Sequence, residues 1–329
     1  MNFEQLFNQF KNIKVVVLGD VMLDSYMWGH VERISPEAPV PVVSITKKEY
    51  RIGGAGNVAL NLVALGASTS VISMIGNDED GKQLKQMFEN FNVQTQLLLT
   101  SSERITTNKT RVISRNQQMM RLDAEITKDI SVTDEQRLIN GIEILFKNNK
   151  PNVLIFEDYN KGVLTANIIK AVIALCKQYN VITTVDPKHK NFFAFKGVDI
   201  FKPNLKEVKE GLNILLEEVN INNLQHIHAG LKEKLQHEIS LITLSEYGVF
   251  YQSSSENKII PTHIRNIADV SGAGDTVIAV ASLVYAATKQ IKLAAEIANI
   301  AGGLVCEEVG TAAINSKKLL AECELLLNL

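Results

Sequence analysis

Short apolar runs alternate along most of the chain with longer segments whose apolar residues recur at helical spacing. The runs that indicate buried strands are residues 14–18, 71–75, 153–156, 181–185, 200–202 and 241–244. The segments that indicate helices include 3–10, 80–90, 135–146, 164–179 and 277–287. Strands that alternate with long amphipathic helices predict an α/β fold, with a mostly parallel central sheet covered on both faces.

Two regions interrupt this alternation and have the character of a separate small sheet. Pro36, Pro39 and Pro41 exclude a helix and favour an extended chain, which continues as a strand over 40–45. Segments 106–113 and 117–122 are rich in β-branched and alternating residues. We therefore predict one domain over residues 1–329, with a β-sheet lid formed by segments near 26–50 and 104–123.

Polar residues follow five of the predicted strands, where open α/β sheets place their ligands. The residues concerned are Asp20 and Asp24, Glu157 to Gly162, Asp186 and Lys188, Asn204 and Glu207, and Ser245 and Gly248. Any one of them is explained by a turn or a helix cap, and Asn204 with Glu207 fits a capping box. Their recurrence at five strand ends predicts a binding site along that edge of the sheet.

Composition narrows the class of protein. The 329 residues are 46% hydrophobic, enough for a large core, and the net charge of −2 gives no support for a nucleic-acid partner or a membrane surface. Cys176, Cys306 and Cys323 lack metal-ligand spacing and sit in apolar segments, as buried thiols of a reducing compartment do. No apolar run is long enough for a signal core or a membrane span, so we expect a cytoplasmic protein.

The most informative stretch is the turn 269–276, Asp-Val-Ser-Gly-Ala-Gly-Asp-Thr, which leads directly into an apolar helical segment. Gly272 and Gly274 let a ligand approach the backbone, and the free N–H groups of a helix start attract anions, phosphate above all. The turn lacks the Lys-Ser/Thr ending of a P-loop and has Asp275 instead. Asp275 fits a base that takes a proton from a hydroxyl attacking phosphate, or else a residue that caps the helix.

A second glycine-rich stretch, Arg-Ile-Gly-Gly-Ala-Gly-Asn-Val-Ala, covers residues 51–59. Gly54, Gly56 and Ala59 imitate a dinucleotide fingerprint only loosely, because that fingerprint directly follows the first strand of its fold. The stretch favours a loop whose backbone lies close to a polar ligand. Asn57, at the predicted helix start, is placed to bond a hydroxyl group.

The turn 269–276, the Gly-Gly-x-Gly-Asn pattern at 53–57 and the Asn-x-x-Glu pattern at 204–207 resemble the ribokinase-like (PfkB) family of sugar kinases. The resemblance implies a three-layer αβα fold, a lid that closes over the sugar, and often a homodimer formed through that lid. It implies ATP as co-substrate and Mg²⁺ as cofactor. The residues that it assigns to catalysis are Asp275 as base, with Gly272, Ala273 and Gly274 as the amides that hold the phosphate.

The same resemblance assigns the nucleotide side of the site. Asn204 and Glu207 would act on magnesium and phosphate, largely through water, and Lys188 would balance phosphate charge. Residues that fall where relatives hold the nucleotide are Ser245, Gly248 and Asn299.

A narrower set of motifs resembles the heptose 7-phosphate kinase branch of this family. These motifs are residues 19–24, 33–41 (Arg-Ile-Ser-Pro-Glu-Ala-Pro-Val-Pro), 111–118, 121–123, 158–162, 186–188 and 310–312. The branch phosphorylates the anomeric hydroxyl of D-glycero-D-manno-heptose 7-phosphate on the route to ADP-heptose and lipopolysaccharide. A substrate that already carries phosphate calls for basic groups in its pocket. Substrate-binding candidates are Asp20, Asp24, Gly53, Gly54, Asn57, Arg115, Asn116, Lys161 and Arg33, with Arg111 as a further basic candidate.

Many members of the branch carry a nucleotidyltransferase domain after the kinase, but no His-x-Gly-His-like motif follows here, so we expect kinase activity alone. Three alternatives remain. The chain could phosphorylate another sugar or sugar phosphate, or be a catalytically silent sugar-phosphate sensor, although the intact Asp275 argues against the sensor. A dinucleotide-dependent oxidoreductase has only the weak 54–59 pattern in its favour.

Overall fold

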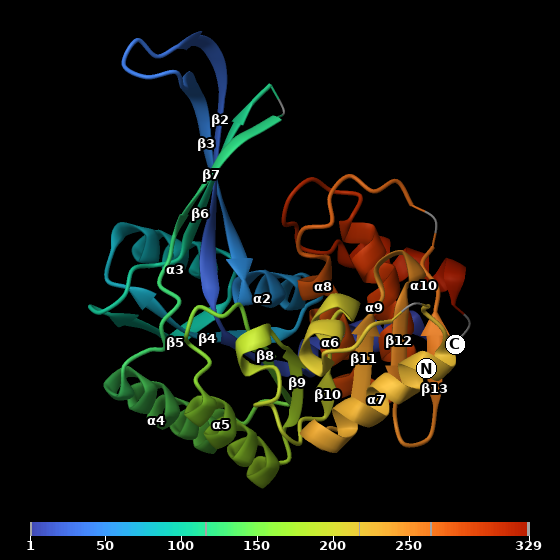
Figure 1. Ribbon diagram of the computed structural model, residues 1–329. Helices are drawn as coiled ribbons and strands as arrows, with labels where there is room; N and C mark the ends of the chain where they lie inside the picture. Colours follow the sequence, from blue (N-terminus) through green and yellow to red (C-terminus); the bar gives the residue numbers. More distant parts are fainter. Residues whose placement is uncertain (1, 116, 217, 264, 328–329) are drawn as a thin grey trace.

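The central sheet organises the molecule and has helices on both faces (Figure 1). The computed structural model describes residues 2–115, 117–216, 218–263 and 265–327. Within them the sheet has nine strands in the order β13-β12-β11-β10-β9-β8-β1-β4-β5. The strands are β1 (Lys14–Gly19), β4 (Ser68–Gly76), β5 (Gln94–Ser101), β8 (Val153–Glu157), β9 (Ile182–Asp186), β10 (Ile200–Phe201), β11 (Ile239–Thr243), β12 (Val249–Gln252) and β13 (Asn257–Ile260). All neighbours from β5 to β11 are parallel, whereas β12 and β13 pair antiparallel at one edge.

Alternate residues of the central strands pack into two separate cores. Val15 and Val17 of β1 belong to one core, and Val16 and Leu18 belong to the other. This alternation follows from the two-residue period of a strand and requires helices on each face. The first core is covered by α1 (Phe3–Gln9), α2 (Ala55–Ala64), α3 (Glu79–Asn90), α8 (Ala273–Thr288), α9 (Ile291–Val305) and α10 (Ser316–Leu326). The second is covered by α4 (Val132–Asn149), α5 (Ala166–Tyr179), α6 (Leu205–Leu212) and α7 (Ile221–Leu235).

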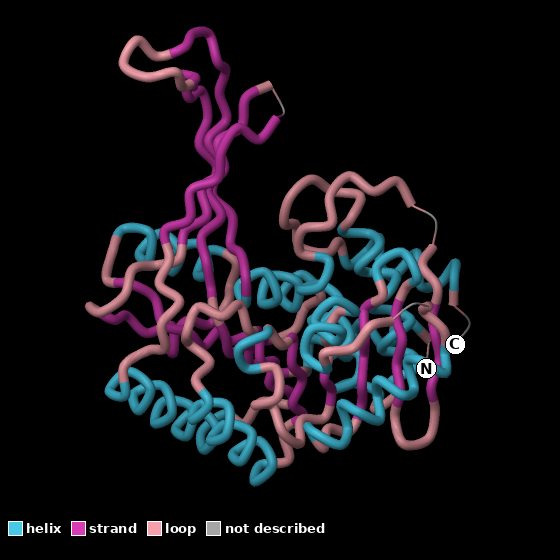
Figure 2. Tube along the Cα trace, in the orientation of Figure 1, coloured by secondary structure: helices cyan, strands magenta, loops and turns pink. Residues whose placement is uncertain are grey.

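A second sheet of four strands forms the lid and projects from the α/β body (Figures 1 and 2). Its strands, in the order β3-β2-β6-β7, are β2 (Val21–Ile34), β3 (Pro41–Gly54), β6 (Asn108–Ser114) and β7 (Gln117–Ala124). Strand β2 is buried next to the body and becomes exposed outward. Among the described helices, none is both long and apolar enough to cross a membrane.

The predicted α/β class, the mostly parallel sheet and the small lid are confirmed. The sequence pattern missed β5, β12 and β13, and the lid strands begin closer to the body than predicted. Strands β12 and β13 are four residues each, too short for an alternation pattern to stand out. The described residues also include three short 3₁₀ helices: η1 (Phe10–Asn12), η2 (His189–Asn191) and η3 (Ser245–Tyr247).

Candidate functional site

The start of α8 presents backbone N–H groups next to Asn57. Gly272 precedes the helix with φ of +81°, a conformation that glycine adopts freely, and a Cβ there would lie 2.7 Å from Asn57 Nδ2. The N–H groups of Ala273 and Thr276 donate to the carbonyls of Val270 and Gly272. Among the described residues, no partner is recorded for the N–H groups of Gly274 and Asp275. The helix start is therefore equipped to bind an anion.

Asp275 is buried where three segments of the chain meet. Its Oδ2 accepts a hydrogen bond from Asn57 Nδ2 of α2 at 2.8 Å, and its Oδ1 accepts one from the Tyr159 hydroxyl at 2.7 Å. Only 4% of the residue is exposed. Its side chain does not cap α8, so the alternative of a simple helix cap does not describe this residue.

The environment of Asp275 makes it a stronger base than an ordinary aspartate. Burial raises the pKa of Asp275 to about 6, while the hydrogen bonds from Asn57 and Tyr159 limit that rise. At neutral pH the carboxylate is mostly deprotonated and yet more basic than a solvated one. These are the properties of a general base that works near pH 7.

Asp20 holds the loop that carries Tyr159. Its carboxylate accepts hydrogen bonds from the backbone N–H groups of Tyr159, Lys161 and Val163 at 2.9, 3.0 and 3.0 Å. The residue is 1% exposed. We predicted a substrate contact for Asp20, and the structure shows its carboxylate engaged in fixing this loop.

Asp275 belongs to a buried cluster of ionisable side chains. Glu157, Asp186 and Asp275 each place a carboxyl oxygen within 4.8 Å of the others, and Lys202 Nζ lies 2.7 Å from Asp186 Oδ2. Burial alone would raise the pKa of Asp186, but the charges of Lys188 and Lys202 outweigh it and hold the pKa below its usual value. Glu157 is fully buried, and neither carboxyl oxygen has a hydrogen-bond partner in the described chain. Burial, and then the charges of Asp186 and Asp275, raise the pKa of Glu157 well above its ordinary value.

Lys188 joins this cluster to the start of α6. Its Nζ lies 3.3 Å from Asp186 Oδ1 and 2.7 Å from Glu207 Oε1. Asn204 and Glu207 form the capping box that their spacing predicted, with both reciprocal bonds at 2.8 Å. Both carboxylate oxygens of Glu207 are thus hydrogen-bonded within the protein, one to Lys188 Nζ and the other to the Asn204 N–H.

The three residues assigned to the nucleotide lie together at the β11–β13 edge. Gly248 has φ of +95°, and a Cβ there would lie 2.0 Å from the Ile260 carbonyl oxygen. The Gly248 N–H donates to the Ser245 carbonyl, and Asn299 Nδ2 donates to the Pro261 carbonyl at 2.8 Å. Gly248 and Asn299 therefore shape the same stretch of backbone, beside the exposed Ser245.

At the base of the lid, Gly53 and Gly54 allow close backbone approach. A Cβ on Gly53 would lie 2.2 Å from Asp24 Oδ2, and one on Gly54, where φ is +61°, would lie 2.4 Å from the Asp20 carbonyl oxygen. Asp24 is buried and pairs with Arg111 Nη1 at 2.5 Å. Asp24, Gly53 and Gly54, which we predicted to bind the sugar substrate, thus lie in contact with one another.

The predicted basic residues are dispersed. Lys161 belongs to the loop held by Asp20, and its Nζ pairs with Glu125 Oε1 at 2.7 Å. Arg33, near the exposed end of β2, and Arg115, between β6 and β7, have exposed side chains. Within a single chain the structure does not bring these two arginines to Asp275. Asn116 lies outside the described residues.

Comparison with known proteins agrees with this arrangement. The pattern of the pfkB family of carbohydrate kinases matches residues 12–318 of the chain. The chain belongs to the PfkB family of carbohydrate kinases. Membership identifies the molecule as a sugar kinase and accounts for its use of ATP.

Curated relatives of this kinase are named bifunctional protein HldE. The Geotalea uraniireducens protein is 38% identical over 322 residues, which cover 97% of the kinase and 64% of the relative. The Aliarcobacter butzleri protein is 40% identical over 305 residues, which cover 92% of the kinase and 62% of the relative. The chain thus spans less than two thirds of the length of these relatives.

Solved structures share the fold of this kinase. Phosphofructokinase-2 from Escherichia coli in complex with potassium superposes with a TM-score of 0.77 at 17% identity, covering 95% of this chain and 99% of that chain. Ribokinase from Arabidopsis thaliana complexed with ribose and ATP gives a TM-score of 0.72 at 16% identity, covering 94% and 98%. The three-layer architecture with its lid is therefore the ribokinase-like fold.

Sequence reasoning missed two residues of the kinase site and underrated a third. Tyr159, which donates a hydrogen bond to Asp275, lies within the motif 158–162, but the sequence pattern gives it no role of its own. The sequence pattern includes Lys202 only as the last residue of the strand 200–202. A lysine at the end of an apolar strand nevertheless indicates a buried ion pair. Glu157 was noted only as one of several polar strand ends, because nothing in the sequence indicates an unpartnered carboxyl.

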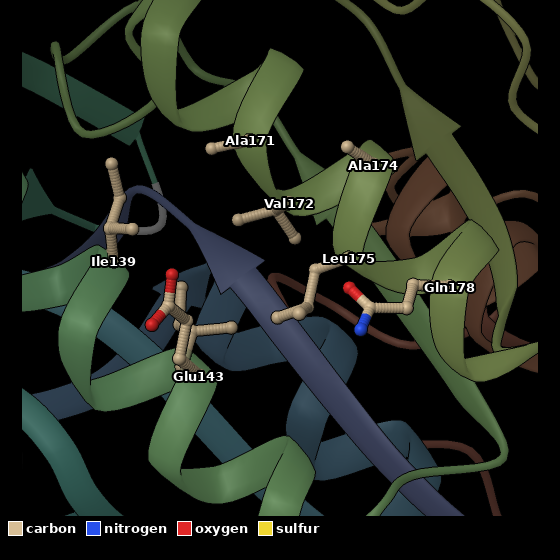
Figure 3. Close-up of a pocket in the computed structure, with 8 residues that line it drawn as sticks. Ile139, Glu143, Ala171, Val172, Ala174, Leu175 and Gln178 are labelled. Carbon is tan, nitrogen blue, oxygen red and sulfur yellow. The ribbon is translucent and has the colours of Figure 1, made fainter.

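A cavity of 180 Å³ lies between α4 and α5 (Figure 3). Ile139, Val172 and Leu175 give it apolar walls, and Glu143 and Gln178 border it (Figure 3). It contains none of the residues predicted to bind ATP or sugar.

Proposed function

We propose that this kinase transfers the γ-phosphate of ATP to the anomeric hydroxyl of D-glycero-D-manno-heptose 7-phosphate. The product, the 1,7-bisphosphate, would serve synthesis of ADP-heptose and the lipopolysaccharide core in the cytoplasm. The observation that carries the reaction is Asp275, a buried base beside the amides that start α8. The choice of acceptor rests on the motifs shared with the heptose 7-phosphate kinase branch and on the similarity to HldE proteins.

The proposed chemistry follows from the groups around Asp275. The anomeric hydroxyl donates its proton to the Asp275 carboxylate while its oxygen forms a bond to the γ-phosphorus. The bond from that phosphorus to the β–γ bridging oxygen breaks, and ADP leaves. The backbone N–H groups of Gly272, Gly274 and Asp275 would meet the charge on the transferring phosphoryl group, whereas the N–H of Ala273, which we also predicted for this role, already donates to the Val270 carbonyl at 3.3 Å. A positioned base of this kind contributes about 10²–10⁴-fold to the rate.

The nucleotide would lie on the β11–β13 side of Asp275, along Ser245, Gly248 and Asn299. Lys188, whose Nζ reaches toward the carboxylates of both β9 and α6, would balance phosphate charge. Oxygen donors suit Mg²⁺, and the occupied capping box is consistent with water-mediated contacts from Asn204 and Glu207. When bound, the ion neutralises charge on the ATP phosphates.

The acceptor would lie under the lid, against Asp24, Asn57 and the end of β3 at Gly53 and Gly54. Arg111, which pairs with Asp24, and Lys161, whose backbone N–H donates to Asp20, would supply positive charge to the acceptor phosphate. Arg33, Arg115 and Asn116 stay predicted contacts of the sugar phosphate. Because Arg33 and Arg115 lie on the outer lid, their contribution would require the lid of a second copy.

We propose that two copies associate through their lids. The described part of the lid exposes an unusual number of large apolar side chains for so small a sheet. They are Ile34, Val40, Ile45, Tyr50, Met119, Met120 and Leu122. Exposed apolar surface of this kind marks interaction sites. Sedimentation of the purified kinase at micromolar concentration checks this proposal, with a dimer expected and a monomer contradicting it.

An ADP-release assay with ATP and Mg²⁺ tests the choice of acceptor. The panel contains heptose 7-phosphate, fructose 6-phosphate, ribose, fructose and mannose. We expect strong turnover only with heptose 7-phosphate. Strong turnover with another sugar would refute the proposed acceptor and leave the reaction in place. No turnover with any of them would favour the silent-sensor alternative.

A further inference from the structure

Arg51 links the lid directly to the loop that follows α9. It lies near the end of β3, and its Nη1 donates to the Val309 carbonyl at 2.9 Å and to the Thr311 carbonyl at 3.4 Å. Its Nε donates to Glu49 Oε1 of the same strand at 2.7 Å. One guanidinium group thus ties a lid strand to the α/β body. Hydrogen bonds from a charged donor are stronger than neutral ones.

The loop is shaped to receive this side chain. Gly310 has φ of +74°, and a Cβ there would lie 2.5 Å from Arg51 Nη1 and 3.1 Å from the Tyr26 hydroxyl. The guanidinium of Arg51 also lies over the Tyr26 ring, 4.9 Å from its centroid. Only glycine permits so close an approach. Side chains from both strands at the base of the lid, Tyr26 of β2 and Arg51 of β3, therefore contact the loop at Gly310.

The same loop holds the beginning of the turn 269–276. The Gly310 N–H donates to Asp269 Oδ2 at 2.9 Å. The other carboxylate oxygen, Asp269 Oδ1, accepts from the Ser271 N–H at 2.9 Å and from its hydroxyl at 2.8 Å. Ser271 directly precedes Gly272, whose conformation sets the direction of the amides at the start of α8. Hydrogen bonds, joined by short stretches of backbone, therefore connect the lid to the proposed phosphate site.

We propose that Arg51 is a positioning residue that couples the lid to the phosphate-binding turn. When the lid closes over the acceptor, Arg51 holds residues 309–311 in place. Through the hydrogen bond from Gly310 to Asp269, it thereby fixes the amides that bind the transferring phosphate. This inference rests on the proposed function of the turn. It predicts that nucleotide and acceptor strengthen each other's binding, because coupling between two sites is reciprocal.

Four proteins test this coupling: the wild type, Arg51→Ala, Arg51→Lys and Arg121→Ala. Arg121 is a matched control, since it is a lid arginine that pairs with Asp123 of its own strand at 2.9 Å. The measurements are kcat, both KM values, the affinity for Mg·ADP with and without heptose 7-phosphate, and hydrogen exchange of peptides covering 268–276 and 306–314. We expect Arg51→Ala to lower kcat at least tenfold, to abolish the effect of the acceptor on ADP affinity, and to speed exchange in both peptides.

Arg51→Lys keeps the charge and should recover part of each loss, whereas Arg121→Ala should match the wild type. The inference is overturned if Arg51→Ala keeps the wild-type dependence of ADP affinity on the acceptor, or if exchange in 268–276 does not change. It is also overturned if kcat falls only in proportion to a loss of folded protein. A wild type that turns over no sugar refutes the proposed function instead, and the exchange comparison, which needs no acceptor, still decides the link.

Discussion

Replacing Glu157 by glutamine should stabilise the protein at neutral pH. Glu157 is fully buried, its carboxyl oxygens have no hydrogen-bond partner among the described residues, and Asp186 and Asp275 lie beside it. An ionised carboxylate there would be desolvated and repelled by two others, so the folded state favours the protonated form. Burial and these charges raise the pKa of Glu157 well above its ordinary value of 4.5.

The raised pKa gives the sign and size of the effect. Above pH 4.5 the unfolded chain releases this proton while the folded protein keeps it, so stability falls as pH rises toward the folded pKa. One retained proton corresponds to about 1.4 kcal/mol of unfolding free energy per pH unit. From pH 5 to pH 7 the loss is at most about 2.7 kcal/mol, the value reached when the folded protein keeps the proton throughout this range. Glutamine has nearly the same shape and does not titrate, so the variant should avoid this loss.

Urea unfolding followed by circular dichroism at pH 5, 6 and 7 measures the difference. The unfolding free energy of Glu157→Gln should exceed that of the wild type by more at pH 7 than at pH 5, and this increase should not exceed about 2.7 kcal/mol. Glu143→Gln, on the exposed side of α4, serves as the control and should show no such trend. A gap between Glu157→Gln and wild type that stays constant with pH would refute the reasoning.

Two further predictions concern the surroundings of Asp275. Because the pKa of Asp275 is about 6, a pH profile of kcat/KM for the acceptor should fall tenfold per pH unit below pH 6. Tyr159→Phe removes a hydrogen bond to the carboxylate and should therefore raise this pKa and move the acidic limb of the profile to higher pH. An acidic limb at the same pH in both proteins would contradict the assignment of Asp275 as the base. Lys202→Met should destabilise the protein by about 3–5 kcal/mol, since it leaves Asp186 buried without one of its two cations. Urea unfolding measures this loss, and a change below about 1 kcal/mol would show that Lys188 alone is sufficient.

The spacing of apolar residues predicted the α/β class, because most strands and helices show the pattern that is typical of their type. The strands near Asp275 are buried on both faces and appear as continuous apolar runs, and the long helices keep one apolar side. Strands β12 and β13 are short and edge-like, and their pairing depends on β11, which no local pattern reveals. The prolines and β-branched residues predicted the lid, but its strands reach the body because β2 and β3 pair as far as Val21 and Gly54, which no local pattern reveals.

The candidate site was predictable where its functional residues lie close together in the sequence. The stretch 269–276 shows its glycines and its aspartate in eight residues, and Asn57 stands out after the second glycine cluster. Contacts between distant segments were not visible. Asp20 resembles a ligand-binding aspartate in the sequence, but its carboxylate is taken up by three backbone N–H groups of a loop about 140 positions away. Such a role appears only when the chain is folded.

The measurement that tests the central claim most directly is the effect of Asp275→Asn on turnover and on nucleotide binding. The amide cannot accept the hydroxyl proton, but it preserves the shape beside Asn57 and Tyr159. We predict that kcat with the preferred acceptor falls by about 10²–10⁴-fold, the usual contribution of a positioned base, while the affinity for Mg·ADP stays within about threefold of wild type. Turnover close to that of the wild type would show that Asp275 is not the base.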